Sequence, residues 1–407
     1  MFLCLALLTL LPATVSISPG VKVELTQKGI DYGRQLGIAS IQSKLKTIRI
    51  PDISGTTNVP AVGKVKYSLS GLQLLDVGLP KSALDLVTGS GVRLSIGDAY
   101  MKLHLRSVPS AEYELLKFGR KSLEKQICPL VQTAVSELNP ELKTMNVLAK
   151  VDQYAEIEYS MVSSPVISNT SLVLNLKGEF YNIGKHQEPP FTATDFSMPT
   201  EANNMMYMGI SAFTVNSAAF VYTTAGILSL YITDDMIPKS SPFRLTTKSF
   251  GIFVPQVEEK FPDLPMKLLV KAVKSPTVTF EPDNMTIQAA ATVTAYAIQP
   301  NATLSPLFVL SLESSVSGRV FVSGIKLAGE VTLQKMNMTL VTSYVGDFRV
   351  RTALLHQPQF IKCVFPFTER LAQGYPLPMI GKMKLVSSQL HILKDYMLIG
   401  TDVQFMD

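Results

Sequence analysis

The chain has 407 residues, of which 46% are hydrophobic and 17% charged, so it can form a large folded core and is not a disordered protein. This length suits two domains of about 200 residues each. The net charge of +5 is concentrated near the start: residues 17–128 carry 16 Lys and Arg against 9 Asp and Glu, whereas residues 129–407 carry 21 against 23. A basic first part indicates an anionic partner there.

The first residues indicate secretion. Residues 2–15 read FLCLALLTLLPATV, an uncharged, leucine-rich stretch that is too short to span a bilayer. We predict a signal peptide over residues 1–16, in preference to a buried N-terminal strand. Four N-glycosylation sequons support the prediction, and their acceptors are Asn169, Asn284, Asn301 and Asn337. Without the leader, two cysteines are left, Cys128 and Cys363, which either form one bridge or stay as thiols.

Residues 26–47 have the pattern of a helix that ends before Pro51. Apolar residues recur at helical spacing, namely Ile38, Ile41, Leu45 and Ile48. Glycines recur every four residues, at Gly29, Gly33 and Gly37. Because glycine weakens a helix, three in register indicate that something lies close to this face. We expect a neighbouring strand there, in preference to a ligand chain.

Alternation of apolar and polar residues predicts antiparallel strands after this helix. The segments are 64–69, 92–96, 101–106, 157–161 and 172–176. A second helix is predicted over 110–138, with a kink at Pro129. The proline-containing segment 182–199 has no clear period and is predicted to link two domains.

The second half repeats the same order of elements. Helices are predicted over 205–219, from Thr246 onwards and over 354–371. Strands are predicted over 227–232, 268–273, 277–280, 286–297, 307–312, 319–322, 328–333 and 390–401. Two uncharged stretches, 202–233 and 284–312, are diluted with polar residues, so we interpret them as buried core rather than as membrane spans. The pattern indicates two similar α+β units.

Motifs for enzyme chemistry are missing from the sequence. The four histidines are scattered, and the sequence contains no H-E-x-x-H, G-x-S-x-G, Walker or C-x-x-C pattern. Two S-x-x-K matches, at 43–46 and 122–125, lack the companion motifs of acyl-transfer enzymes, and Asp234-Asp235 suits a turn beside Pro238. We therefore expect neither an enzyme nor a metal site.

The basic residues of the first part are the remaining chemical signal. Lys44, Lys46 and Arg49 flank the end of the first helix, and Lys64, Lys66 and Lys102 fall on the polar faces of strands. An acidic lipid head group or another polyanion would suit them, and a solvated surface is the alternative. Nucleic acid is not expected, because no motif for it is present.

Several sequence blocks stand out along the mature chain: PGVKVELTQKGIDYG near the start, KLKTIRIPDISG, VLAKVDQY, LKGEFY, DDMIPKSSPFRLTTK and GYPLP. Together, over nearly the whole mature chain, they resemble the family of bactericidal/permeability-increasing protein and lipopolysaccharide-binding protein. The resemblance implies an α+β, boomerang-shaped fold of two similar antiparallel barrels with long helices, joined by a central sheet. We expect barrels over residues 17–181 and 200–407, with the linker at 182–199 between them.

The resemblance also implies a function and a site. Each barrel would hold phospholipid acyl chains in an apolar pocket, with no other cofactor, and the basic end would bind the lipid A part of lipopolysaccharide at the bacterial outer-membrane surface. Matched positions are Lys44, Lys46, Arg49, Lys64, Lys66 and Lys102. The expected protein is a secreted, antibacterial protein of innate immunity. The alternative is a carrier for phospholipid or neutral lipid that does not recognise lipopolysaccharide.

The chain departs from the family pattern after Leu105. It passes through Arg106 to Ser110 straight into the predicted second helix, without the family's basic, Trp-containing segment, and it has no Trp at all. Cys128 matches the second cysteine of the family's disulfide, and the first falls in the missing stretch. We therefore expect a shortened N-terminal barrel.

Overall fold

The computed structural model describes residues 18–47, 53–59, 63–69, 73–98, 100–104, 148–200, 203–237, 239, 243–323, 326–348, 375–376 and 383–405. The chain packs as two units. The large unit comprises residues 1–24, 147–165 and 173–407, and the small unit comprises residues 25–146 and 166–172. The predicted domain and linker boundaries stay predictions.

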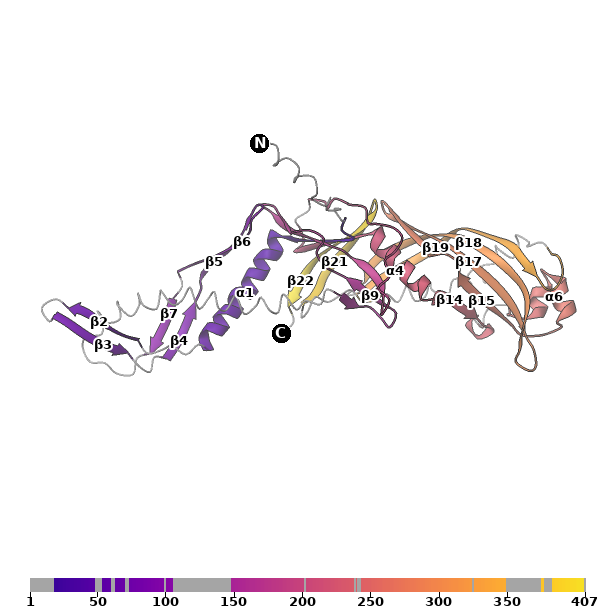
Figure 1. Cartoon of the computed structure of the whole chain (residues 1–407), viewed down its shortest axis with the longest axis horizontal. Helices are drawn as coiled ribbons and strands as arrows, with labels where there is room; N and C mark the ends of the chain where they lie inside the picture. Colours follow the sequence, from indigo (N-terminus) through magenta and orange to yellow (C-terminus); the bar gives the residue numbers. More distant parts are fainter. Residues whose placement is uncertain are drawn as a thin grey trace, which may run out of the picture. The chain divides into compact units, whose positions relative to one another are not determined.

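The described elements are mostly strands (Figure 1). The helices are α1 (Gln27–Thr47), α4 (Ala212–Thr224), the 3-10 turn η1 (Asp234–Met236), α5 (Thr247–Gly251) and α6 (Pro255–Lys260). The first strands are β1 (Val21–Thr26), β2 (Ile53–Val59), β3 (Gly63–Leu69), β4 (Gln73–Gly78), β5 (Lys81–Val87), β6 (Gly91–Gly97), β7 (Tyr100–His104), β8 (Leu148–Lys150), β9 (Ala155–Glu158), β10 (Val166–Ile167), β11 (Ser171–Leu176) and β12 (Glu179–Asn182). The later strands are β13 (Met206–Ser211), β14 (Ser229–Ile232), β15 (Met266–Ala272), β16 (Thr277–Glu281), β17 (Asn284–Ile298), β18 (Leu304–Ser323), β19 (Lys326–Ser343), β20 (Tyr375–Pro376), β21 (Met383–Leu393) and β22 (Tyr396–Phe405).

A long antiparallel sheet forms the main part of the large unit. Its order is β14-β15-β17-β18-β19-β20, with β16 paired to β17. In Figure 1, β17, β18 and β19 run side by side as a curved sheet. Every second residue of β17 from Ala291 to Ala297 is buried, as is every second residue of β18 from Phe308 to Leu312. This alternation places one face of the sheet on the core and the other in solvent.

The short helices cover the core-facing side of this sheet. Phe250 of α5 and Val257 of α6 are buried in the same cluster as Leu268, Leu310 and the rest of the sheet's inner face. Thr246 caps α5, because its Oγ1 accepts a hydrogen bond from the Ser249 amide at 3.2 Å. The predicted helix from Thr246 is thus two helices, and the second begins at Pro255, where a missing amide proton costs nothing.

A second sheet of the large unit contains β11, β1, β13, β22 and β21 in that order. The predicted helix over 205–219 is wrong in its first part, because residues 206–211 form β13 and pair with β22 from Met206–Thr401 to Ser211–Tyr396. Helix α4 begins only after Ser211, whose side chain caps it. Pairing with a strand about 190 residues away overrides the local pattern.

Two further strand predictions change in the structure. The predicted strand over 390–401 is a hairpin of β21 and β22 that turns at Asp395, which has a φ of 71°. The turn contains neither Gly nor Pro, the residues that usually mark a turn in a sequence. The separate strands predicted at 307–312 and 319–322 are one strand, β18, which continues through a polar middle. The uncharged stretches 202–233 and 284–312 do contain core strands, as predicted.

The segment after β12, residues 183–200, has no helix or strand, yet it is attached to the large unit. Lys22 of β1 forms an ion pair with Asp195 at 2.8 Å and donates to the carbonyl of Phe196. The Phe196 ring stacks on Tyr396 of β22 at 4.6 Å, and the Tyr396 hydroxyl donates to the carbonyl of Ser197 at 2.8 Å. Buried ring contacts and paired polar groups hold this irregular segment in place.

The small unit has helix α1 and three two-stranded pairings, β2–β3, β4–β7 and β5–β6. Helix α1 confirms the prediction for residues 26–47 within one residue, and it packs against β4 and β5. Its buried apolar residues are Ile30, Ile38 and Ile41.

Some predictions lie outside the described residues. They are the signal peptide at 1–16, Arg49, the helices over 110–138 and 354–371, Cys128 and Cys363. No helix in the described part of the chain is long and apolar enough to cross a membrane.

Candidate anion-binding site

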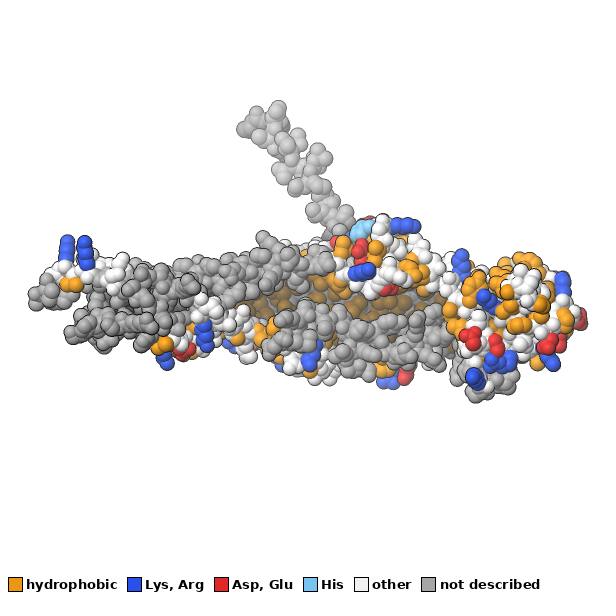
Figure 2. Space-filling model, turned by 90° about the horizontal axis from the view of Figure 1, so that it is seen from below, with side chains coloured by type: hydrophobic (Ala, Val, Ile, Leu, Met, Phe, Trp, Pro, Cys, Tyr) orange, Lys and Arg blue, Asp and Glu red, His pale blue; other side chains and the backbone are white. Residues whose placement is uncertain are grey.

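Two of the predicted basic residues lie together on the β2–β3 hairpin. In its register Lys64 is opposite Asn58 and Lys66 is opposite Thr56. Residues two apart on a strand point to the same side, roughly 7 Å apart along the chain. Both lysines are exposed. Figure 2 shows two basic side chains standing side by side on this hairpin.

The hairpin has no acid of its own to neutralise these lysines. Residues 53–69 contain neither Asp nor Glu. The face that carries Lys64 and Lys66 also carries the exposed side chains of Thr56, Asn58 and Ser68. Two ammonium groups among hydroxyl and amide donors can bind a phosphate or another anion.

Lys102, in contrast, already has a counterion. It lies on β7 directly opposite Asp76 of β4, and its Nζ is 4.0 Å from the Asp76 carboxylate. The same carboxylate accepts a hydrogen bond from the hydroxyl of Tyr100 at 3.2 Å. The Lys102 ammonium also lies 5.7 Å from the Tyr100 ring centroid. Because Asp76 offsets its charge, we expect Lys102 to contribute less to anion binding than Lys64 or Lys66.

The other predicted cations lie at or beyond the end of α1. Lys46 is exposed in the last turn of the helix, where a cation is favourable. Lys44 lies two residues earlier in the same helix. Of the six predicted residues, the described structure therefore places Lys64 and Lys66 on one surface and Lys102 beside an acid.

The glycine face of α1 is open in the described structure. A Cβ added at Gly33 or Gly37 would meet no atom of the described residues within 4 Å. Among the described residues no strand contacts these two positions, and the choice between a strand and a ligand chain stays a prediction.

A cluster of charged residues that sequence analysis missed surrounds Lys177 in the large unit. Glu179 of β12 pairs directly with Glu158 of β9, and Lys177 Nζ lies 3.5 Å and 3.4 Å from their carboxylates. Glu188, mostly exposed, is 3.8 Å away. The two strand carboxylates are brought together only by the register of β9 and β12, so no sequence pattern marks them.

These contacts shift several pKa values. Burial alone would lower the pKa of Lys177, but its hydrogen bond to Tyr181 and the charges of Glu179 and Glu158 outweigh burial and raise that pKa. Burial raises the pKa of the Tyr181 hydroxyl to about 12. Burial also raises the pKa of Glu179, although Lys177 opposes this shift.

The cluster predicts a loss of stability at alkaline pH. In the folded chain Lys177 and Tyr181 keep protons that the unfolded chain loses above their ordinary pKa values of 10.5 and 10.0. The free energy of unfolding is therefore expected to fall as the pH rises from about 10 to about 12. Melting temperatures across this range should show the fall, and Tyr181→Phe should make it shallower. An equal pH dependence in wild type and variant would contradict this account.

The four sequon asparagines are all exposed. Asn169 lies in the bend between β10 and β11, Asn284 begins β17, and Asn337 lies within β19. Asn301 lies in the turn between β17 and β18, where its Oδ1 accepts hydrogen bonds from the amide and the hydroxyl of Thr303. Exposure is compatible with a glycan at each position, and glycosylation stays a prediction.

Comparison with known proteins gives matches along the whole chain. The family model for the LBP / BPI / CETP family, N-terminal domain, matches residues 29–118, and the model for the C-terminal domain matches residues 149–405. A bactericidal permeability-increasing protein of Sebastes schlegelii is 58% identical, with all of both chains covered. A lipopolysaccharide-binding protein of Homo sapiens is 30% identical over 98% of this chain and 96% of its own length.

The alignment with the Sebastes schlegelii protein runs over 471 positions, whereas this chain has 407 residues, so at least 64 aligned positions have no counterpart here. This agrees with a chain that is shorter than its relative, and the place of the missing segment after Leu105 stays a prediction.

A solved structure shares the fold. The crystal structure of lipopolysaccharide binding protein matches with a TM-score of 0.58 and 26% identity, covering 96% of this chain and 100% of that one. The α+β fold expected from the resemblance is thus confirmed. Both halves match the same family, and a relative at 58% identity covers the chain completely, so this protein belongs to the LBP / BPI / CETP family.

Proposed function

We propose that this chain is a secreted lipid-binding protein of innate immunity that binds the lipid A part of bacterial lipopolysaccharide. The observation that carries the proposal is the β2–β3 hairpin, where Lys64 and Lys66 share one exposed face and residues 53–69 contain no carboxylate. Lipid A presents phosphates next to acyl chains. Ammonium groups suit the phosphates, and the positions Gly33 and Gly37 of α1 are uncovered among the described residues. The names of the relatives support this choice of ligand.

The direct test is binding of the purified, secreted chain to lipid A micelles over a series of salt concentrations. Because exposed charges are screened by salt, we expect affinity to fall at least about tenfold from low to high ionic strength. Phosphatidylcholine vesicles serve as the uncharged control and should show little salt dependence. Binding to lipid A that is weak at every salt concentration would contradict the proposal.

A second candidate function is that of a lipid-transfer carrier, which would use the uncovered positions Gly33 and Gly37 of α1 but not the hairpin lysines. A lipid-transfer carrier needs space for an acyl chain but no anion site. Such a carrier would move phospholipid or neutral lipid between vesicles at a rate that salt does not change. Transfer without lipid A binding would favour the carrier.

A further inference from the structure

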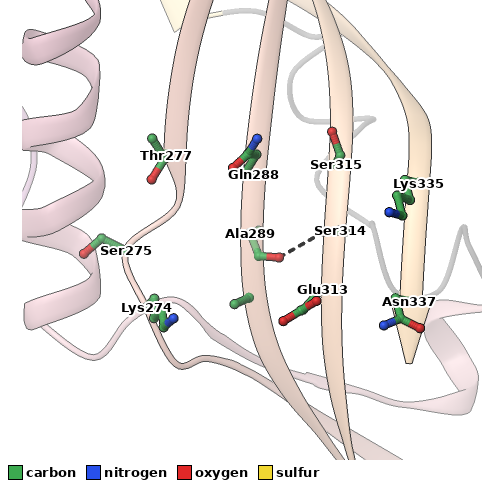
Figure 3. A pocket seen from close by; sticks show the side chains of 11 residues that line it. Lys274, Ser275, Thr277, Gln288, Ala289, Glu313, Ser314, Ser315, Lys335 and Asn337 are labelled. Carbon is green, nitrogen blue, oxygen red and sulfur yellow. Dashed lines mark hydrogen bonds between the residues drawn. The ribbon is translucent and has the colours of Figure 1, made fainter. Parts of the chain in front are cut away.

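A polar groove lies on the solvent face of the large sheet. It has a volume of about 440 Å³ and crosses β16, β17, β18 and β19 (Figure 3). In the sheet register, Gln288, Ser315 and Lys335 form one row across its floor. Glu313 and Asn337, directly opposite each other on β18 and β19, form part of the next row on the same face.

The lining is suited to a ligand with many hydroxyl groups. It is made of hydroxyl, amide, carboxylate and ammonium side chains together with two alanines, and it has no aromatic residue. Glu313 and Lys335 are exposed, and neither forms an ion pair within the part of the chain that the structure describes. Charged groups of both signs can bind sugar hydroxyls, which both donate and accept hydrogen bonds.

The groove contains its own point of attachment for a sugar. Asn337 is the acceptor of the sequon Asn337-Met338-Thr339 and lines the groove. Its side chain is exposed, whereas Met338, on the opposite face, is buried in the core. A glycan attached to Asn337 therefore starts inside the groove, opposite Glu313.

We propose that Asn337 carries an N-linked glycan whose first sugars lie in this groove, bound by Glu313, Gln288 and Lys335. Because attachment is covalent, even weak hydrogen bonds hold the sugars at a high effective concentration. The other sequons of this unit begin β17 and lie in a turn, and neither asparagine lines the groove. The proposal requires the secretion stated under the proposed function but not lipid binding, so each can fail without the other.

The test is the rate at which an endoglycosidase releases each glycan from the folded, secreted protein, followed by mass spectrometry of the glycopeptides. A glycan bound in the groove should be released from Asn337 more slowly than from the other acceptor asparagines. Glu313→Ala removes one charged partner and should speed release at Asn337 by roughly fivefold, since that is the factor expected for one net hydrogen bond. Release at Asn301 should not change, and in denaturant all sites should be released alike.

Two results would overturn the proposal. One is an unmodified Asn337 in the secreted protein. The other is release from Asn337 at the rate seen at Asn301, with no effect of Glu313→Ala. Gln288→Ala is a second variant for the case in which Glu313→Ala folds poorly. It removes an uncharged side chain that lies on the same face and is proposed to bind the glycan. Measurement of lipid A binding on the same samples separates this result from the proposed function.

Discussion

Reversing the two hairpin charges, Lys64→Glu with Lys66→Glu, is expected to weaken binding to lipid A micelles by roughly a hundredfold at low salt. Both ammonium groups lie on one exposed face of a hairpin whose residues 53–69 contain no carboxylate, so the reversal replaces two attractions with two repulsions. The remaining binding should depend little on salt. Because both side chains are exposed, the melting temperature should stay within about 2 °C of wild type.

A matched control separates this effect from a change in net charge. Lys267 and Lys271 also lie on one face of a single strand, β15, in the large unit. Lys267→Glu with Lys271→Glu changes the net charge by the same amount and should leave lipid A binding within about twofold of wild type. An equal loss in both double variants would show that the hairpin is not the site.

Replacing Lys177 with methionine is expected to destabilise the large unit by about 3 kcal/mol, because it leaves the buried carboxylate of Glu179 without its cation. The side chains of Lys177 and Glu179 are 19% and 7% exposed, so solvent screens this pair little. The melting temperature should fall by roughly 6–12 °C. Lys271→Met, on an exposed face of β15, should change it by about 1 °C or less.

The double variant Lys177→Met with Glu179→Met tests the cause of this loss. If the single variant is unstable because a buried charge is unpaired, removing the second charge should restore a large part of the melting temperature. A double variant as unstable as the single variant would show instead that the packing of the Lys177 chain is what matters.

The parts of the fold that could be predicted from sequence are those with a strong local period. Helix α1 and the alternating strands β3, β6 and β17 follow their local sequence periods, and one face is buried in α1 and in β17. For strand β13 the sequence predicts a helix, because the pairing partner β22 lies near the other end of the chain and leaves no local signal. For the hairpin at Asp395 the sequence predicts one strand, because a non-glycine residue with positive φ makes the turn.

For the candidate site, the sequence predicts which basic residues are involved but not how they lie relative to one another in space. The run of lysines indicated an anion site, and the register of β2 and β3 shows that Lys64 and Lys66 share a face. The sequence did not show that Asp76 offsets the charge of Lys102, since these residues are 26 positions apart. The Lys177 cluster and the groove at Asn337 depend on strand register in the same way.

The measurement that tests the central claim most directly is the acetylation rate of each lysine, followed by mass spectrometry, with and without lipid A micelles. Bound phosphates should protect Lys64 and Lys66 by roughly tenfold, because pairing favours the protonated ammonium and acetylation needs the free amine. Lys102 should be protected less, and Lys271 not at all. Protection of Lys64 and Lys66 that disappears at high salt would agree with the account, whereas unchanged rates at both residues under conditions of full lipid A binding would contradict it.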